Sequence, residues 1–267
     1  MPDFDPYQPY GPPVETRVRV VTWNVWGQYG EWEQREKLLH EELVRVQPDV
    51  VCLIESWASE TENQPAAIAS TLGYTNSVFA AGSHADAGIG LVSRWPITSS
   101  ELRPLGEKKG GVLCAQIEGP RGRIQMFVVA LDWPLSASAV RQQQVRELLQ
   151  IVAETTTFEF VTVLGGDFNA HPDSDEMRML LGKAASDRVF YDAWEIAGDG
   201  TAGITWSNAN PLAQIGKYPD RRFDYVLSEW PRLGAAGHPV HCERLGVLPE
   251  DAPQISDHYG VLADLRY

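Results

Sequence analysis

Eight short runs rich in β-branched residues recur along the chain, and they constrain its fold more than any other feature. We expect strands at 17–22, 50–54, 89–93, 112–117, 124–131, 160–164, 224–227 and 261–265. Apolar residues at helical spacing predict helices at 39–46, 145–152 and 177–181. Because strands and helices alternate irregularly and some strands are close enough to form hairpins, the pattern indicates a layered α/β protein with mixed sheets.

Residues 1–15 are acidic and rich in proline, and we expect them to form a flexible tail before a single domain at 16–267. No apolar run is long enough to cross a bilayer and the chain start lacks a signal-peptide layout. These features predict a cytoplasmic protein with no stable membrane insertion. The three cysteines are far apart, so we expect buried, inert thiols rather than a metal site or a disulfide scaffold. We also expect a monomer.

The charge balance limits the classes of function. Asp and Glu outnumber Lys and Arg by 36 to 22, which gives a formal net charge of −14. Such a chain lacks the basic surface that binds nucleic acid by releasing counterions, so a phosphate-bearing substrate requires local positive charge or a bound metal ion. Lys108 and Lys109 form a small basic patch that could contact a phosphate, although an exposed hairpin is the simpler interpretation.

Polar side chains follow several predicted strands at the point where each strand ends. They are Asn24, Glu55, Asp132 and Asp167, with Asn169 close behind, and Asp257-His258 precedes the last strand. Taken singly, such residues are common in turns. Repeated at five strand ends, they predict a crevice at a sheet edge, where a hard cation offsets the repulsion between carboxylates. Gly165 and Gly166, directly before Asp167, allow the backbone to approach a ligand closely.

Seven motifs occur in order: T-W-N-V at 22–25, L-I-E-S at 53–56, S-R-W-P-I at 93–97, G-G-D-F-N at 165–169, T-W at 205–206, R-F-D-Y-V at 222–226 and S-D-H at 256–258. In content and order they resemble the endonuclease/exonuclease/phosphatase superfamily, which includes deoxyribonucleases, abasic-site endonucleases, bacterial sphingomyelinases and inositol polyphosphate phosphatases. The resemblance covers nearly the whole chain. It implies a four-layer α/β/β/α sandwich of two mixed sheets flanked by helices, with the site at the open edge between the sheets.

The resemblance also implies a metal site and a base. Glu55 would be the principal ligand of Mg²⁺, with Mn²⁺ as an alternative, and Asn24 and Asp257 would lie beside it. Asp167 would position or deprotonate the attacking water. This set of candidate ligands suits Mg²⁺, which keeps several waters and binds few protein carboxylates together with substrate phosphate.

Other residues would contact the substrate. By the same resemblance, Asn169 would bind the phosphate, and His258 would contact the phosphate and protonate or stabilise it. Asp224 would orient His258, which fixes the tautomer and ring angle of the imidazole. We expect Arg94, in the S-R-W-P-I motif, and Trp133, at the mouth of the site, to bind substrate.

Asp132 departs from the superfamily pattern, because many relatives carry at this point a histidine that takes part in acid chemistry or phosphate binding. Asp132 could add a second metal ligand, serve as an acid, or impair the site. We expect a metal-dependent phosphoesterase that cleaves a phosphodiester, either nucleic acid or a small or lipid-derived ester, and the net charge favours the latter. The alternatives are a phosphomonoesterase of the same fold and a catalytically impaired binding protein.

Overall fold

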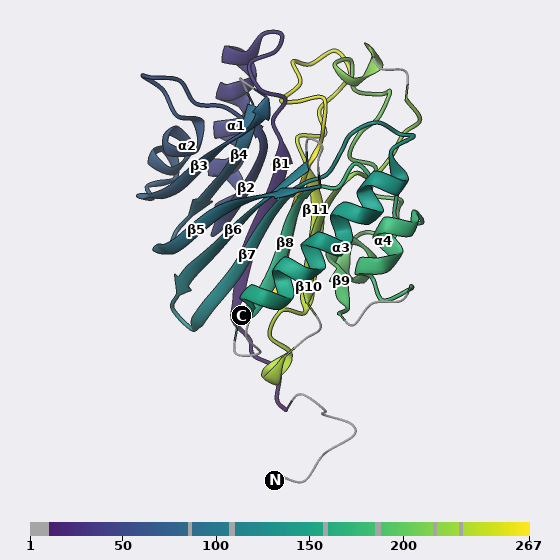
Figure 1. Cartoon of the computed structure of the whole chain (residues 1–267). Helices are drawn as coiled ribbons and strands as arrows, with labels where there is room; N and C mark the ends of the chain where they lie inside the picture. The colour runs from purple at the N-terminus through teal and green to yellow at the C-terminus, as the bar shows by residue number, and fades with distance from the viewer. Residues whose placement is uncertain are drawn as a thin grey trace.

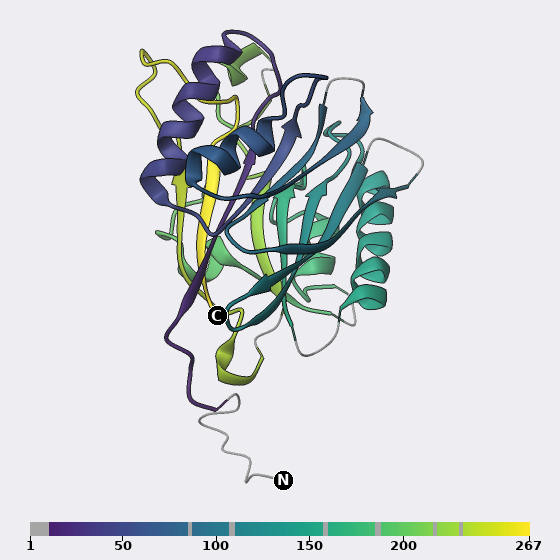
Figure 2. The same ribbon diagram turned by 90° about the vertical axis from the view of Figure 1, so that its left-hand side faces the viewer.

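The computed structural model describes residues 11–84, 87–106, 110–156, 160–184, 188–215, 218–229 and 232–267. Within these residues, two six-stranded sheets lie face to face and helices cover their outer faces (Figures 1 and 2). The predicted α/β/β/α sandwich is therefore confirmed. Most of the predicted tail lies outside the described residues, but the backbone of Val14 is hydrogen-bonded to Gly234 and to the side chain of Arg266.

Each sheet mixes parallel and antiparallel strands. The first has the order β11-β12-β1-β2-β4-β3, with β1 (Arg17–Asn24), β2 (Val50–Ser56), β3 (Asn76–His84), β4 (Ala87–Ser93), β11 (Pro239–Leu245) and β12 (Gly260–Arg266). The second has the order β5-β6-β7-β8-β10-β9, with β5 (Ile97–Leu105), β6 (Gly110–Gly119), β7 (Gly122–Ala130), β8 (Val161–Asp167), β9 (Phe190–Asp192) and β10 (Asp224–Glu229). The pairs β1–β2 and β7–β8 are parallel, and the other neighbouring pairs are antiparallel.

Helices form the two outer layers. On the first sheet lie α1 (Trp32–Val46) and α2 (Gln64–Leu72), and on the second lie α3 (Ser138–Thr155) and α4 (Asp175–Leu180); α5 (Ala193–Ala197) follows β9 (Figures 1 and 2). Leu43 of α1 packs in the cluster outside the first sheet, and Leu148 of α3 in the cluster outside the second. Of two neighbouring residues on β1, Val20 belongs to the cluster between the sheets and Val21 to the cluster under α1. Both faces of the central strands are thus buried, which explains their continuous apolar sequences.

The eight predicted strands and the three predicted helices are all present in the described chain. Strands β3, β5, β9 and β11 and helices α2 and α5 were not predicted. Strand β5 lies at a sheet edge with most of its side chains exposed, so its sequence, ITSSELRPL, carries no apolar run. Helix α2 has a clear cap at each end, Asn63 and a left-handed Gly73, but its apolar side chains are mostly small.

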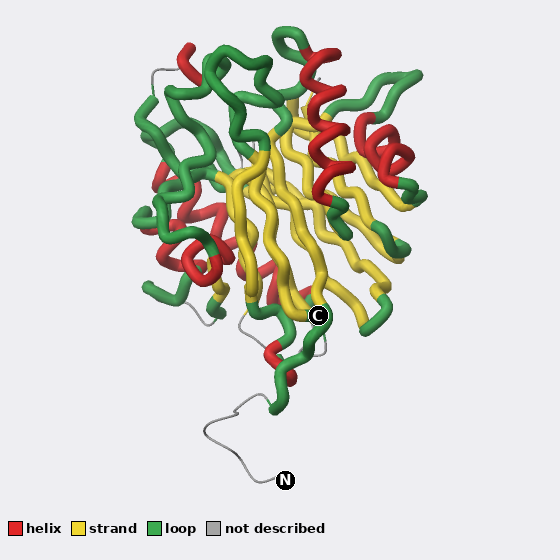
Figure 3. Tube along the Cα trace, turned by 180° about the vertical axis from the view of Figure 1, so that it is seen from behind, coloured by secondary structure: helices red, strands yellow, loops and turns green. Residues whose placement is uncertain are grey.

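The strand registers place the expected site residues at one edge of both sheets. In the parallel pair β1–β2, Asn24 and Glu55 lie at the same strand ends. In the antiparallel pair β8–β10, Asp224 lies directly opposite Asp167. Strand β12 begins just after His258 and runs from this edge toward the C-terminus. Figure 3 shows long loops gathered at this edge, away from the C-terminus.

The cysteines have the environment that the sequence predicts. Cys52, Cys114 and Cys242 are free and buried, and burial raises the pKa of each thiol. None of the described helices combines the length and apolar character that a membrane-spanning helix needs.

Candidate active site

Asn24 connects the two sheets at the site edge. Asn24 is the last residue of β1 and is buried, with 2% of the residue exposed. The amide nitrogen Nδ2 donates to Oε1 of Glu55 at 3.1 Å and to Oδ2 of Asp167 at 3.0 Å. Its Oδ1 accepts from the backbone N–H of Trp26 at 3.0 Å. One amide therefore holds a carboxylate from each sheet at a common point.

Glu55 and Asp257 form the acidic, partly exposed side of the site. Burial raises the pKa of Asp257 to about 6; the charge of His258 opposes the shift and that of Glu55 adds to it. Only Oε1 of Glu55 and Oδ1 of Asp257 accept hydrogen bonds, from Asn24 and Ser256, so each carboxylate keeps one oxygen without a hydrogen bond from a described residue. Two neighbouring carboxylates with available oxygens suit a hard divalent cation such as Mg²⁺.

Three residues of the site have left-handed backbone conformations. Trp26, Glu55 and Asn169 have φ values of 56°, 55° and 50°, and only two other described non-glycine residues have a positive φ. Such a conformation costs about 1–3 kcal/mol, which the surrounding structure must offset, and it is concentrated at functional sites. At Glu55 it coincides with an irregularity in the pairing of β2 with β4, between Ile54 and Ser56, and at Asn169 it comes two residues after the end of β8.

Asp167, Asp224 and His258 form a buried group next to the acidic side. Nδ1 of His258 donates to Oδ2 of Asp224 at 2.8 Å, and its Nε2 lies 3.9 Å from Oδ2 of Asp167. Burial opposes the charged form of His258, but the carboxylates of Asp224 and Asp167 outweigh it and hold the pKa of His258 well above its usual value. Burial and the charge of Asp224 raise the pKa of Asp167. Asp224 thus fixes the imidazole so that Nε2 faces Asp167.

Two acidic groups at this edge could hold a cation. Potential ligand atoms of Asp167, Asp224 and His258 lie within 4.8 Å of one another. In that group, however, Oδ2 of Asp224 and Nδ1 of His258 are already hydrogen-bonded to each other. Glu55 and Asp257 are more exposed and have available oxygens, so their side of the site is the better place for a hydrated Mg²⁺.

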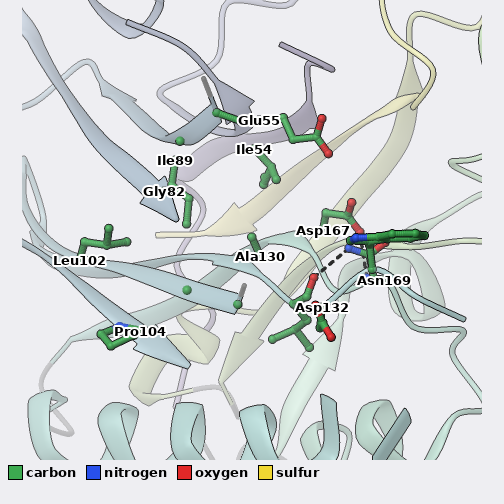
Figure 4. Close-up of a pocket in the computed structure, with 16 residues that line it drawn as sticks. Ile54, Glu55, Gly82, Ile89, Leu102, Pro104, Ala130, Asp132, Asp167 and Asn169 are labelled. Atoms are coloured by element: carbon green, nitrogen blue, oxygen red, sulfur yellow. Dashed lines mark hydrogen bonds between the residues drawn. The ribbon is translucent and has the colours of Figure 1, made fainter. Parts of the chain in front are cut away.

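The loops after β7 and β8 are tied together beside Asp167. The backbone N–H of Asn169 donates to Oδ1 of Asp167 at 2.8 Å, and its Nδ2 donates to the carbonyl of Leu131 at 2.9 Å. The backbone N–H of Asp132 donates to Oε1 of Gln144 at 3.0 Å. The Asp132 carboxylate has no hydrogen-bond partner among the described residues and lines a cavity (Figure 4).

This cavity has a volume of about 250 Å³ and lies between the two sheets at the site edge. Its polar end is formed by Glu55, Asp132, Asp167 and Asn169. Its other end is apolar, with Leu102 and Pro104 farthest from the carboxylates (Figure 4). The cavity therefore joins the candidate catalytic groups to an apolar chamber.

The two residues expected to bind substrate lie in different places. Trp133 lines the cavity and is 55% exposed. Arg94 follows β4 and pairs with Asp49 at 2.8 Å, just before β2 begins. At ~3.3 Å per strand residue, that is roughly 20 Å from Glu55 at the other end of β2. The structure does not bring Arg94 to the site, because its motif follows β4 at the opposite edge. Lys108 and Lys109 lie outside the described residues.

Several supporting residues were not predicted. The buried Arg35 of α1 donates to five backbone carbonyls in the loops after β1 and before β12. Ser256 donates to the carbonyl of Asn24 and accepts from the amide of His258. Thr205 accepts from two backbone amides at the start of β10. Ser256 and Thr205 belong to the S-D-H and T-W motifs, but the sequence did not indicate what either residue does. Nothing in the sequence distinguishes Arg35 from the other polar residues of an amphipathic helix.

Comparisons with known proteins identify the family and the fold of the chain. Residues 21–258 match the sequence profile of the Endonuclease/Exonuclease/phosphatase family. No curated protein matches the sequence. Many solved structures share the fold, and three of them illustrate the likeness. D. rerio TDP2 complexed with single strand DNA product has a TM-score of 0.75 at 21% identity, covering 95% of this chain and 100% of that one.

The human nocturnin catalytic domain with bound sulfate anion has a TM-score of 0.71 at 20% identity, covering 93% of this chain and 94% of that one. An endonuclease/exonuclease/phosphatase from Beutenbergia cavernae DSM 12333 has a TM-score of 0.70 at 25% identity, covering 94% of this chain and 71% of that one.

Proposed function

The chain belongs to the endonuclease/exonuclease/phosphatase family of metal-dependent phosphoesterases, and from that premise we propose that it hydrolyses a phosphodiester with the help of a bound divalent cation, Mg²⁺ or Mn²⁺. One observation carries the proposal. A single amide, that of Asn24, holds Glu55 and Asp167 together across the two sheets, and the imidazole of His258 faces Asp167 from 3.9 Å. This combines a cation site, a base and a phosphate-facing imidazole within one crevice.

Glu55, with Asp257 and Asn24 beside it, would hold the cation. When bound, the cation offsets charge on the phosphate and stabilises the leaving oxygen. Glu55 and Asp257 repel each other, and a cation held by them would offset that repulsion. Their partial exposure also leaves room for the waters that Mg²⁺ retains.

Asp167, Asn169 and His258 would act on water and phosphate. Asp167 orients the attacking water and accepts its proton, and its raised pKa suits a base that works near neutral pH. Asn169 keeps one N–H of its amide available for a phosphate oxygen, since the other donates to the carbonyl of Leu131. His258, charged and oriented by Asp224, donates from Nε2 to a phosphate oxygen and stabilises the charge that develops there.

The charges of the site favour a diester over a monoester. None of the described residues that line the cavity is basic. A phosphodiester carries one negative charge near neutral pH, whereas a monoester approaches two. With the chain at −14, a small or lipid-derived diester also suits the protein better than a nucleic acid duplex does. If the substrate is nucleic acid, added salt will sharply reduce cleavage, whereas cleavage of a small ester will respond little.

Hydrolysis of two model esters tests the proposal. We expect bis-p-nitrophenyl phosphate to be cleaved faster than p-nitrophenyl phosphate with Mg²⁺ or Mn²⁺, and neither to be cleaved in excess EDTA. His258→Ala and Asp167→Asn should each lower kcat/KM by about 10²–10⁴-fold. His241→Ala is the matched control, because His241 is 46% exposed on β11 and remote from the site edge. A His258→Ala protein as active as the wild type would refute this mechanism.

The second candidate, a catalytically impaired binding protein, rests on Asp132. Its carboxylate lines the cavity without a partner among the described residues, where many relatives carry histidine. The retention of Asp167 and His258 in hydrogen-bonded geometry favours an active enzyme in which Asp132 serves as an acid or a second metal ligand. Asp132→His separates the two. If the wild type cleaves neither ester and Asp132→His cleaves both, the impaired site is the correct description.

A further inference from the structure

The cavity beside the candidate catalytic residues extends well beyond the space that a phosphate needs. Away from the carboxylates, its described lining carries no charged side chain. The wall comes from strands of both sheets and includes Ile54, Ile89, Leu102, Pro104, Gly111 and Ala130. Figure 4 shows Ile54, Ala130, Ile89, Leu102 and Pro104 following one another away from Glu55 and Asp167.

Gly111 keeps this chamber empty. A Cβ atom added at Gly111 would lie 3.7 Å from the backbone oxygen of Arg103 and from Cδ1 of Leu102, and 3.8 Å from Cδ1 of Ile89, all in ordinary van der Waals contact. A larger side chain would therefore extend between Leu102 and Ile89 without striking the backbone. Glycine at this strand position leaves open a space that a β-branched residue, the usual choice in such a strand, would fill.

Two large apolar side chains that line the cavity are exposed to solvent. Leu102, on the edge strand β5, is 36% exposed, and Trp133 at the polar end of the cavity is 55% exposed. Large apolar side chains around a concave surface are typical of a ligand site, because their exposure to water is unfavourable until something covers them. An anionic chain is a poor occupant, since Glu55 and Asp132 line the same cavity.

We propose that the chamber binds an uncharged apolar group attached to the phosphate of the substrate, either an aromatic ring or a short hydrocarbon chain. This inference rests on the proposed function, because the site at the polar end must take the phosphate. The size is suitable: an apolar cavity of about 150 Å³ is enough for benzene, and the whole cavity, which includes the polar end that would take the phosphate, measures about 250 Å³. The substrate would place its phosphate near Asn169 and its apolar group between Ile89 and Leu102.

Binding of three phosphonates tests the proposal without requiring catalysis. Methylphosphonate, phenylphosphonate and hexylphosphonate, each used as its monomethyl ester, share a head with one negative charge, as in a diester, and differ only in the attached group. We expect phenylphosphonate, hexylphosphonate or both to bind at least tenfold more tightly than methylphosphonate in titration calorimetry with Mg²⁺, since each buried methylene contributes about fourfold in affinity. The tighter of the two identifies a ring or a chain as the preferred group. Equal affinity for all three phosphonates would overturn the proposal.

Two variants locate the effect in the chamber. Gly111→Leu fills the space between Ile89 and Leu102, and should bring the ratio of affinities close to one. Leu102→Ser removes apolar surface from an exposed position, so it is expected to fold normally and to reduce the ratio severalfold. The matched control is Leu233→Ser, an 84% exposed leucine at the other end of the molecule, which should leave the ratio unchanged. A ratio unaffected by both chamber variants would also overturn the proposal.

The outcome is distinguishable from failure of the proposed function. If neither p-nitrophenyl ester is hydrolysed, the proposed function fails, and the phosphonate affinities still decide whether the chamber binds an apolar group. If the esters are hydrolysed and the three phosphonates bind equally, the function stands and the chamber proposal falls.

Discussion

Replacing Arg141 by methionine should destabilise the protein strongly, because Arg141 is half of a buried ion pair beneath the site. Its side chain is 4% exposed and that of Glu176 is fully buried, and Nε donates to Oε1 of Glu176 at 2.7 Å. Arg141 Nη1 also donates to the carbonyls of Asp132 and Pro134, at 3.0 and 2.7 Å. The pair thus supports the loop that carries Asp132.

Methionine leaves the hydroxyl of Ser138 as the only partner of the Glu176 carboxylate among the described residues. Removing one member of a buried pair reduces the free energy of unfolding by about 3–5 kcal/mol. At roughly 2–4 °C per kcal/mol for a protein of this size class, the midpoint of thermal unfolding should fall by about 6–20 °C. Glu176→Gln, which keeps an acceptor for Arg141 and removes the charge, should have a smaller effect.

Denaturant and thermal unfolding of the wild type, Arg141→Met and Arg146→Met measure the difference. Arg146 lies on the same helix, is exposed and makes only a 3.5 Å contact with Gln143, so its replacement should change stability by no more than about 0.5 kcal/mol. If Arg141→Met lost less than about 1 kcal/mol, the pair would not be supporting this part of the structure and the reasoning would be refuted.

Three further predictions concern the site itself. Gly166→Ala should prevent stable folding, because its Cβ would lie 1.9 Å from a backbone oxygen of β7. The nearest atoms to a Cβ at Gly165 are side-chain atoms at 3.0–3.4 Å, so Gly165→Ala should cost about 1–3 kcal/mol; urea unfolding compares the two variants. Asp224→Ala should lower kcat for a diester by about 10²-fold or more with little change in KM. Asp224 orients the ring of His258 and does not itself contact the substrate, so an unchanged kcat would contradict that positioning role. Glu55→Gln should raise the Mg²⁺ concentration for half-maximal activity by about tenfold or more, measured by metal titration, and an unchanged titration would remove Glu55 from the metal site.

The central parts of the fold could be predicted because both faces of their strands are buried. Every residue of β8 is buried, and so is every residue of β2 except Glu55, so their apolar runs are continuous. The edge strands could not be predicted in the same way. In β5 the side chains are mostly exposed, and backbone pairing with β6 rather than apolar burial makes the segment a strand. Strand pairing between distant segments leaves little trace in a local pattern.

The candidate site was predictable to a similar degree. Asn24, Glu55 and Asp167 each lie at the end of an apolar strand. The parallel register of β1 and β2 places Asn24 beside Glu55, and the packing of the two sheets brings Asp167 to Asn24. Arg94 also follows a strand, but β4 is antiparallel to β2, so its end lies at the opposite edge. Strand direction, which local sequence does not reveal, separates these cases. The apolar chamber around Gly111 could not be predicted, because a cavity depends on which side chains from distant strands face one another.

Metal-dependent cleavage of bis-p-nitrophenyl phosphate by the EDTA-treated protein tests the central claim most directly. Glu55, Asp257 and Asn24 are proposed to hold a cation without which Asp167 and His258 cannot cleave the ester. Activity should therefore fall to background in EDTA and return when excess Mg²⁺ or Mn²⁺ is added. Full activity retained in EDTA would contradict the account.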